Sequence, residues 1–196
     1  MSSLKTTHRW AVAQQNPELE KELSAGLGIP GLVARIMVAH GIDSIKEGQL
    51  FLTPSLDRDW ADPLVIPGMA VVADRVERAI RSHERIAVFG DFDVDGITST
   101  CLLTEALRSF GANVTPFIPH RFDDGYGLSR AALDRVNELA QPNLIVTVDN
   151  GIAAKEEVSY LESLGIDLVV TDHHEPSDQV PQGVPLTDPK LEDEGP

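Results

Sequence analysis

The 196-residue chain has an ordinary globular composition and a strongly acidic balance. Hydrophobic residues make up 42% and charged residues 24%, which excludes a wholly disordered chain, a collagen or a coiled-coil rod. The 31 acidic residues against 16 basic ones give a net charge of −15, and this charge argues against non-specific nucleic-acid binding. Carboxylates that cluster around bound cations invert the local sign, however, so the net charge does not exclude a phosphate-bearing substrate.

The sequence has no pattern typical of a membrane helix, a signal peptide or a cysteine-based site. No apolar run approaches the roughly 20 residues of a membrane helix, and no apolar stretch follows the first charged residues as in a signal peptide. The single cysteine, Cys101, excludes an internal disulfide and a cysteine-based zinc site. We expect Cys101 to be a small buried residue, and the protein to be cytoplasmic with no membrane partner.

Residues 1–67 predict a mainly helical leader. Apolar residues recur at helical spacing in 17–23, and 30–41 reads as a helix that ends at a glycine. The segment 51–55 is expected to be a loop, and the prolines between 63 and 67 break the pattern.

Residues 68–196 predict an α/β domain. An amphipathic helix over 68–83 is followed by short apolar strands that alternate with helices, which indicates βαβ units and a parallel sheet with helices on both faces. The predicted strands are 86–89, 114–118, 144–148 and 167–171. Beyond them, four prolines from Pro176 to Pro189 exclude a helix, and we expect no closing element there.

Acidic and histidine side chains follow three of the four predicted strands. They are Asp91, Asp93 and Asp95 after the first strand, Asp149 after the third, and Asp172, His173 and His174 after the fourth. Ligands of open α/β sheets bind beyond the carboxyl ends of the strands, so these groups should meet at one edge.

This convergence of carboxylates calls for a cation. Like charges a few ångströms apart repel one another and raise pKa values, and carboxylates with one or two imidazoles suit Mn²⁺ or Mg²⁺. Two such ions stabilise in-line displacement at phosphorus. The alternative is a set of solvated turns, of which Asp149-Asn150-Gly151 has an ordinary sequence. A calcium loop is excluded because Leu102 stands where its last glutamate would be.

A glycine-rich loop follows the second predicted strand. Arg121 beside Gly125 and Gly127 could hold a phosphate through two parallel hydrogen bonds, with the backbone approaching closely. Tyr126 could stack on a base. The alternative is a surface loop with an exposed arginine.

These motifs together resemble the DHH phosphoesterase superfamily. Asp172-His173-His174 is similar to the signature that names it, and the segments 90–99, 121–128 and 147–152 are similar to its other motifs. The leader makes the resemblance strongest to the superfamily's single-stranded-DNA exonucleases. Those proteins continue with a further aspartate motif, a second domain and an OB-fold, so the resemblance implies a DHH domain over 68–196 that is truncated at its C-terminus.

The resemblance implies roles for individual residues. Asp93, Asp95, Asp149 and His173 would be ligands of Mn²⁺ or Mg²⁺, with two ions in a complete enzyme. Asp91 would join these ligands or act from beside them as a catalytic group, and His174 would lie beside the ions as a ligand-orienting or catalytic group. The residues Arg121, Gly125, Tyr126 and Gly127 would bind substrate. Phe89 stands where some DHH phosphatases have a histidine ligand.

The function implied is a metal-dependent 5′→3′ exonuclease acting on single-stranded DNA in repair and recombination. Its partners would be a DNA strand with a 5′ end, a single-strand-binding protein and a helicase. Two alternatives stay open: a DHH phosphodiesterase acting on oligoribonucleotides or cyclic dinucleotides, and a non-catalytic DHH binding module.

Overall fold

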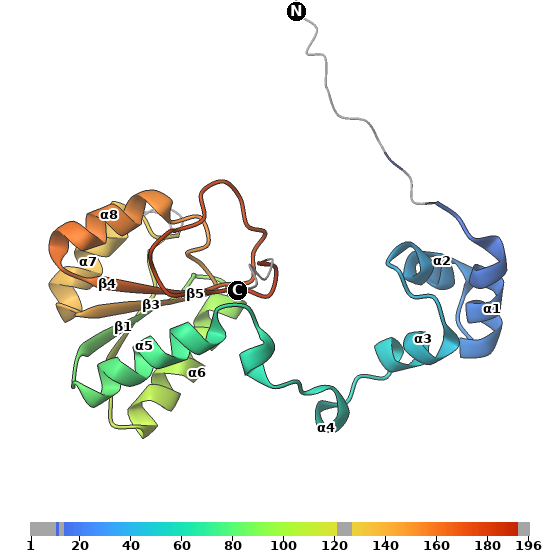
Figure 1. The fold of residues 1–196 in the computed structure, drawn as a ribbon, viewed down its shortest axis with the longest axis horizontal. Helices are drawn as coiled ribbons and strands as arrows, with labels where there is room; N and C mark the ends of the chain where they lie inside the picture. Colours follow the sequence, from blue (N-terminus) through green and yellow to red (C-terminus); the bar gives the residue numbers. More distant parts are fainter. Residues whose placement is uncertain (1–10, 12–13, 121–126, 192–196) are drawn as a thin grey trace, which may run out of the picture. The chain divides into compact units, whose positions relative to one another are not determined.

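The computed structural model describes residues 11, 14–120 and 127–191, which fall into two compact units, 1–61 and 62–196 (Figure 1). The division lies close to the predicted end of the leader at residue 67, and the assignment of domains stays a prediction. No helix in the described ranges is long and apolar enough to cross a membrane.

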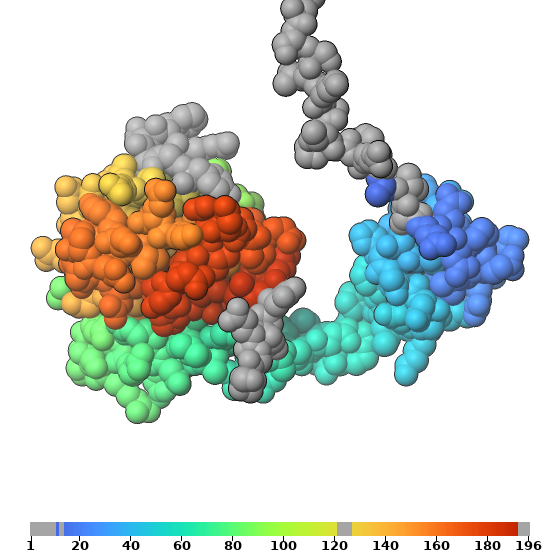
Figure 2. Space-filling model, turned by 45° about the horizontal axis from the view of Figure 1, so that its top comes forward, coloured from blue at the N-terminus to red at the C-terminus, as the bar shows by residue number. Residues whose placement is uncertain are grey.

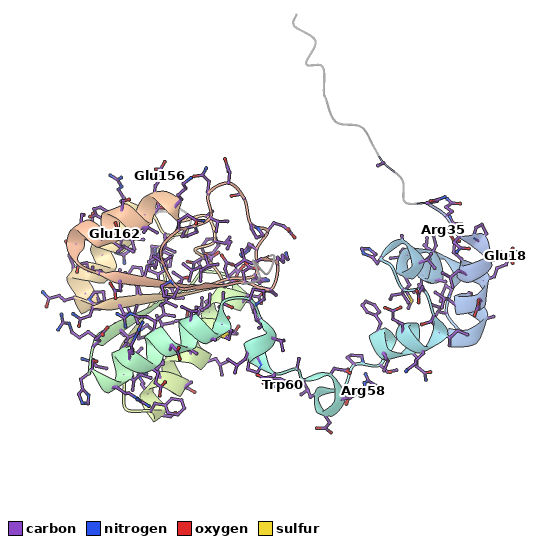
Figure 3. The ribbon with its side chains drawn as sticks, viewed as in Figure 1. Glu18, Arg35, Arg58, Trp60, Glu156 and Glu162 are labelled. Atoms are coloured by element: carbon purple, nitrogen blue, oxygen red, sulfur yellow. The ribbon has the colours of Figure 1, made fainter. Side chains whose placement is uncertain are left out.

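The first unit is helical. Its elements are α1 (Pro17–Leu27), α2 (Gly31–Ala39), α3 (Ile45–Leu52) and the short α4 (Leu56–Asp59). Helices α1 and α2 and the turn after α2 form a small core of Leu23, Ala34, Met37 and Ile42, against which Ile45 of α3 packs. Arg35 of α2, labelled in Figure 3, pairs with the buried Glu20 of α1 across 3.1 Å.

The predicted loop at 51–55 is wrong in its first two residues, which complete α3. The Ser44 side chain accepts the Glu47 N–H and so begins this helix. Pro54 disfavours helical backbone at the preceding Thr53, so the helix ends at Leu52.

The second unit is an α/β sheet domain, as predicted. After a 3₁₀ turn, η1 (Pro63–Val65), its helices are α5 (Met69–Arg81), α6 (Val94–Ser109), α7 (Arg130–Ala140) and α8 (Lys155–Leu164). Its strands are β1 (Arg85–Phe89), β2 (Asn113–Phe117), β3 (Leu144–Val148), β4 (Asp167–Thr171) and β5 (Leu186–Thr187). All strand pairs are parallel, in the order β2-β1-β3-β4-β5.

Strand β5 corrects the expectation that no element closes the proline-rich stretch. The Val170 N–H donates to Pro185 O at 2.9 Å and the Asp172 N–H to Thr187 O at 3.1 Å. Proline is tolerated on an edge strand because it accepts from the neighbouring strand without needing to donate. A two-residue strand beside prolines carries no periodicity, so the sequence contains no signal for it.

Helices cover both faces of the sheet (Figure 1). Alternation along β1 divides its side chains: Ala87 and Phe89 pack with α7 and α8, and Ile86 and Val88 pack with α5 and α6. Glu156, labelled in Figure 3, is exposed on α8.

Cys101 is exposed on α6, so the expectation that it is buried was wrong. Its helix packs on the sheet through other positions.

The first turn of α6 packs so closely against the residues after β1 that no side chain fits between them. A Cβ atom on Gly96 would lie 2.4 Å from Asp91 O, and one on Gly90 would lie 1.9 Å from Thr100 Oγ1. Both positions therefore require glycine. Their contact fixes the turn from Asp91 to Asp93, which carries carboxylates to the sheet edge.

We predict that Gly96→Ala destabilises the α/β unit by about 3 kcal/mol or more, because backbone atoms of Asp91 cannot yield to the added methyl group. Thermal or urea unfolding followed by circular dichroism measures the loss. Leu102→Ala on the same helix, at a position 74% exposed, is the control and should change stability by less than about 0.5 kcal/mol. Equal stability of the two variants would contradict the packing argument.

Candidate metal centre

The candidate site lies where the strand order reverses. The chain runs from β1 outward to β2 and then returns to β3 on the other side of β1, and such a switch point leaves a crevice at the carboxyl ends of the strands. Asp91 and Asp93 follow β1, and Asp149 follows β3. The topology thus places three carboxylates around the crevice.

Asp91, Asp93 and Asp149 form one close group. Each offers a carboxylate oxygen, and these oxygens lie within 4.8 Å of one another. Asp91 is buried and accepts the Phe92 N–H at 2.7 Å. Asp93 is the N-cap of α6 and accepts the Gly96 N–H at 3.0 Å. The acids that follow β1 and β3 thus lie together at one edge of the sheet, while the roles of these residues as ligands stay predictions.

Asp149 adopts left-handed backbone geometry, with φ of 61°. Aspartate tolerates this region better than most residues, but the conformation is strained and such strain gathers at functional sites. One carboxylate oxygen, Oδ1, lies 2.8 Å from His173 Nε2. The other, Oδ2, is buried and has no hydrogen-bond partner among the described residues.

The carboxylates differ in how readily they ionise. Burial, and then the charge of Asp93, raises the pKa of Asp149, although the hydrogen bond from His173 opposes this. The hydrogen bond from the Gly96 N–H holds the pKa of Asp93 below its usual value. A cation in this group would favour the ionised form of each carboxylate. The unpartnered Asp149 Oδ2 and the oxygen-rich donor set fit Mn²⁺ or Mg²⁺.

The two histidines after β4 face different carboxylates. His173 contacts Asp149, and His174 Nδ1 lies 2.7 Å from Asp172 Oδ1. His173 and His174 form a second group with Asp149, with ligand atoms again within 4.8 Å of one another. The hydrogen bond to Asp172 raises the pKa of His174 above its ordinary value.

Asp172 organises this loop, a role of its own that was not predicted from the sequence. Its side chain is 1% exposed. It accepts N–H groups from His173 at 2.7 Å and Ile152 at 2.9 Å, besides contacting the His174 ring. One carboxylate thus ties the histidine loop to the segment after Asp149. Its place in the Asp-His-His sequence was the signal that could have identified it.

Cavities flank this histidine loop on two sides. The first, of about 330 Å³, is lined by Asp95, Asp149 and His173 among others. The second, of about 320 Å³, is lined by Gly127, Asp149 and His174 among others. Asp95 lies outside both close groups, so its role as a ligand stays a prediction that rests on its place in the first cavity. Gly127 borders the second, whereas Arg121, Gly125 and Tyr126 lie outside the described residues.

Phe89 belongs to the core and not to the site. It is fully buried, and its ring lies 5.2 Å from that of Phe117. The position that could have held a histidine ligand thus serves packing, and any bound metal depends on the other side chains.

The fold and site define the class of the protein. Residues 85–195 match the family described as "DHH family, N-terminal domain", and the chain belongs to this family.

Within the family, the chain is similar to proteins named single-stranded-DNA-specific exonuclease RecJ. It is 38% identical to the Bacillus subtilis protein over 93% of this chain and 23% of that protein. It is 37% identical to the Escherichia coli protein over 90% of this chain and 30% of that protein. The chain therefore spans between about a quarter and a third of the length of these curated relatives.

Solved structures give the same relationship. A crystal structure of exonuclease RecJ bound to manganese matches 67% of this chain and 33% of that chain, at 38% identity and a TM-score of 0.59. A crystal structure of RecJ from Thermus thermophilus in complex with Mn²⁺ matches 93% of this chain and 25% of that chain, at 30% identity and a TM-score of 0.61.

We predict that Asp172→Asn lowers the pKa of His174 in the metal-free protein. The carboxylate stabilises the protonated imidazole, so replacing it with a neutral amide favours proton loss at lower pH. An NMR titration of the histidine rings measures the shift. Glu175→Gln, at an exposed carboxylate that pairs with Lys190, is the control and should leave this pKa unchanged. An unaltered His174 titration in Asp172→Asn would contradict the assigned hydrogen bond.

We also predict that Mn²⁺ raises the melting temperature and that Asp149→Asn and Asp93→Ala abolish the rise. A ligand that binds the folded state stabilises it by about 2.7 kcal/mol at a hundred times its Kd, which corresponds to a shift of several degrees. Differential scanning calorimetry with and without Mn²⁺ measures it. Asp178→Asn, at an exposed residue outside both groups, should retain the shift. Retention of the full shift in Asp149→Asn would place the metal elsewhere.

Proposed function

We propose that this chain is the metal-dependent phosphodiesterase part of a 5′→3′ exonuclease that degrades single-stranded DNA. The observation that carries the proposal is the close group of Asp91, Asp93 and Asp149 at the switch point of a DHH fold. The relatives supply the substrate class, because proteins named single-stranded-DNA-specific exonuclease RecJ match most of the chain.

The residues that would hold Mn²⁺ or Mg²⁺ are Asp93, Asp95, Asp149 and His173, with Asp91 beside them. Relatives with solved structures in complex with manganese support this choice of ion. A bound ion would supply positive charge that offsets the negative charge of the phosphate. It would also lower the pKa of a coordinated water molecule.

His174 is the proposed general acid. Asp172 engages its Nδ1 atom, so Nε2 is the atom that would give a proton to the leaving oxygen. In the reaction, a water molecule gives up a proton to the solvent as its oxygen bonds to phosphorus, and the bond from phosphorus to the 3′ oxygen breaks. The 3′ oxygen takes the proton from His174, which releases a 5′-mononucleotide and leaves a phosphate on the shortened strand. The hydrogen bond to Asp172 orients the His174 ring and favours its protonated form.

The loop that ends at Gly127 is the proposed phosphate-positioning element. Gly127 borders the cavity next to His174. Arg121 would contribute a two-pronged contact to a phosphate, Gly125 would let the backbone approach, and Tyr126 would stack on a base.

In the cell, the proposed role is repair and recombination in the cytoplasm. The substrate would be a single strand with a 5′ end, and the protein partners would be a single-strand-binding protein and a helicase. Residues 1–67 would serve as a helical leader to the catalytic domain over 68–196.

We predict that the 196-residue chain releases 5′-mononucleotides from 5′-phosphorylated single-stranded DNA in Mn²⁺ and that a chelator abolishes the release. The reason is that the close group of three carboxylates would repel the phosphate unless a cation offsets its charge. Chromatography of the products measures release.

The controls separate the candidate functions. Asp149→Asn should abolish release, whereas Asp178→Asn should not. Oligoribonucleotides and cyclic dinucleotides should be hydrolysed more slowly than DNA. Faster hydrolysis of either would assign the chain to another substrate class of the DHH family, and metal-dependent DNA binding without hydrolysis of any substrate would make it a binding module.

A further inference from the structure

We propose that the cavity of about 330 Å³ beside His173 is a nucleoside pocket, which takes the sugar and base of one nucleotide next to the phosphodiester that is cleaved. This inference rests on the proposed function and adds to it a binding site for the uncharged part of the substrate. Its distinctive wall comes from residues before β1, outside the segment 85–195 that matches the family.

The lining of the pocket combines apolar and hydroxyl-bearing side chains. Its apolar members include Ile66, Met69, Val148 and Pro189. The hydroxyl-bearing Thr98 and Ser99 of α6 also line it. A base face packs favourably on a thioether such as that of Met69, while hydroxyl groups suit the edge of a sugar or base. The volume lies at the lower end of the range for small-molecule sites.

The charge of the pocket selects the uncharged part of a nucleotide. Asp95, Asp149 and Asp172 line it, and no lysine or arginine does so among the described residues. A phosphate deep in this pocket would face like charges, whereas a phosphate at the metal ligands would have a cation to balance it. We therefore place the phosphate at Asp149 and His173 and the nucleoside beyond them, toward Met69.

The apolar wall is fixed in position by the sheet. Thr187 of β5 donates its hydroxyl to Pro67 O at 2.8 Å. A Cβ atom on Gly68 would lie 1.8 Å from Leu186 O, so the turn before α5 is in direct backbone contact with β5. Figure 2 shows the C-terminal segment, in red, against the green surface of the residues around α5. A wall held in this way needs no rearrangement on binding, which favours affinity.

The lining of the pocket does not favour one base over another. Serine and threonine hydroxyls contact either donors or acceptors on bases, and an apolar wall packs on any base face. The described lining has no asparagine, glutamine or arginine, the side chains that read base edges through paired hydrogen bonds. We therefore expect the pocket to accept all four bases.

The test uses the full 196-residue chain with Mn²⁺ and a short 5′-phosphorylated DNA strand whose phosphorothioate linkages slow cleavage. The fluorescent base 2-aminopurine is placed first, second or sixth from the 5′ end. We expect its fluorescence to change on binding at the first or second position and to stay constant at the sixth. Met69→Ala and Ile66→Ala should reduce this change and raise the Kd about fivefold or more, the low end of the loss when a base contact is removed.

Val71→Ala is the matched control, because Val71 lies on the same helix, is 58% exposed and does not line the cavity. It should bind DNA as the wild type does. Melting curves identify any variant that fails to fold. If Ile66→Ala or Met69→Ala does not fold, the other variant alone provides the test. Normal Kd and fluorescence in both folded variants would overturn the pocket while leaving the proposed function in place. Absence of metal-dependent DNA binding by the wild type would overturn the proposed function, and the pocket with it.

Discussion

Three carboxylates within 4.8 Å of one another are the constraint around which this domain is built. Their mutual repulsion opposes folding unless the charge of each carboxylate is compensated. The structure compensates the three charges unevenly. Asp93 receives a helix N-terminal N–H and Asp91 receives that of Phe92, but Asp149 has one oxygen without a partner among the described residues. The remaining imbalance is best relieved by a cation. The helix start, the glycine contacts and the histidine loop all serve to hold these groups in place.

The parts of the fold that follow from local pattern could be predicted from the sequence. Continuous apolar runs such as 144–148 indicate strands buried on both faces, and the acids after them indicate which edge is functional. The strand order was not predicted, but any parallel arrangement brings the carboxyl ends of the strands to one edge. That is why Asp93, Asp149 and His173 could be grouped without knowledge of the topology.

Other features escaped the sequence because they depend on contacts between distant segments. Strand β5 exists because β4 offers hydrogen-bonding groups to Pro185 and Thr187, and nothing local marks those residues as a strand. The role of Asp172 arises from Ile152, which lies twenty residues earlier in the chain. Likewise, the place of Met69 beside the site depends on β5, since the turn before α5 is held there by Thr187.

The left-handed backbone of Asp149 places the site among those where stability and activity compete. An aspartate with φ of 61° is less stable there than glycine would be, and its buried charge adds to that cost. A search for more stable variants of this domain would thus favour replacing the very residue that both close groups share. An aspartate at such a position is what a stability–activity trade-off would produce. Engineering of this domain should therefore seek added stability in the helices that cover the sheet and leave the turn after β3 as it is.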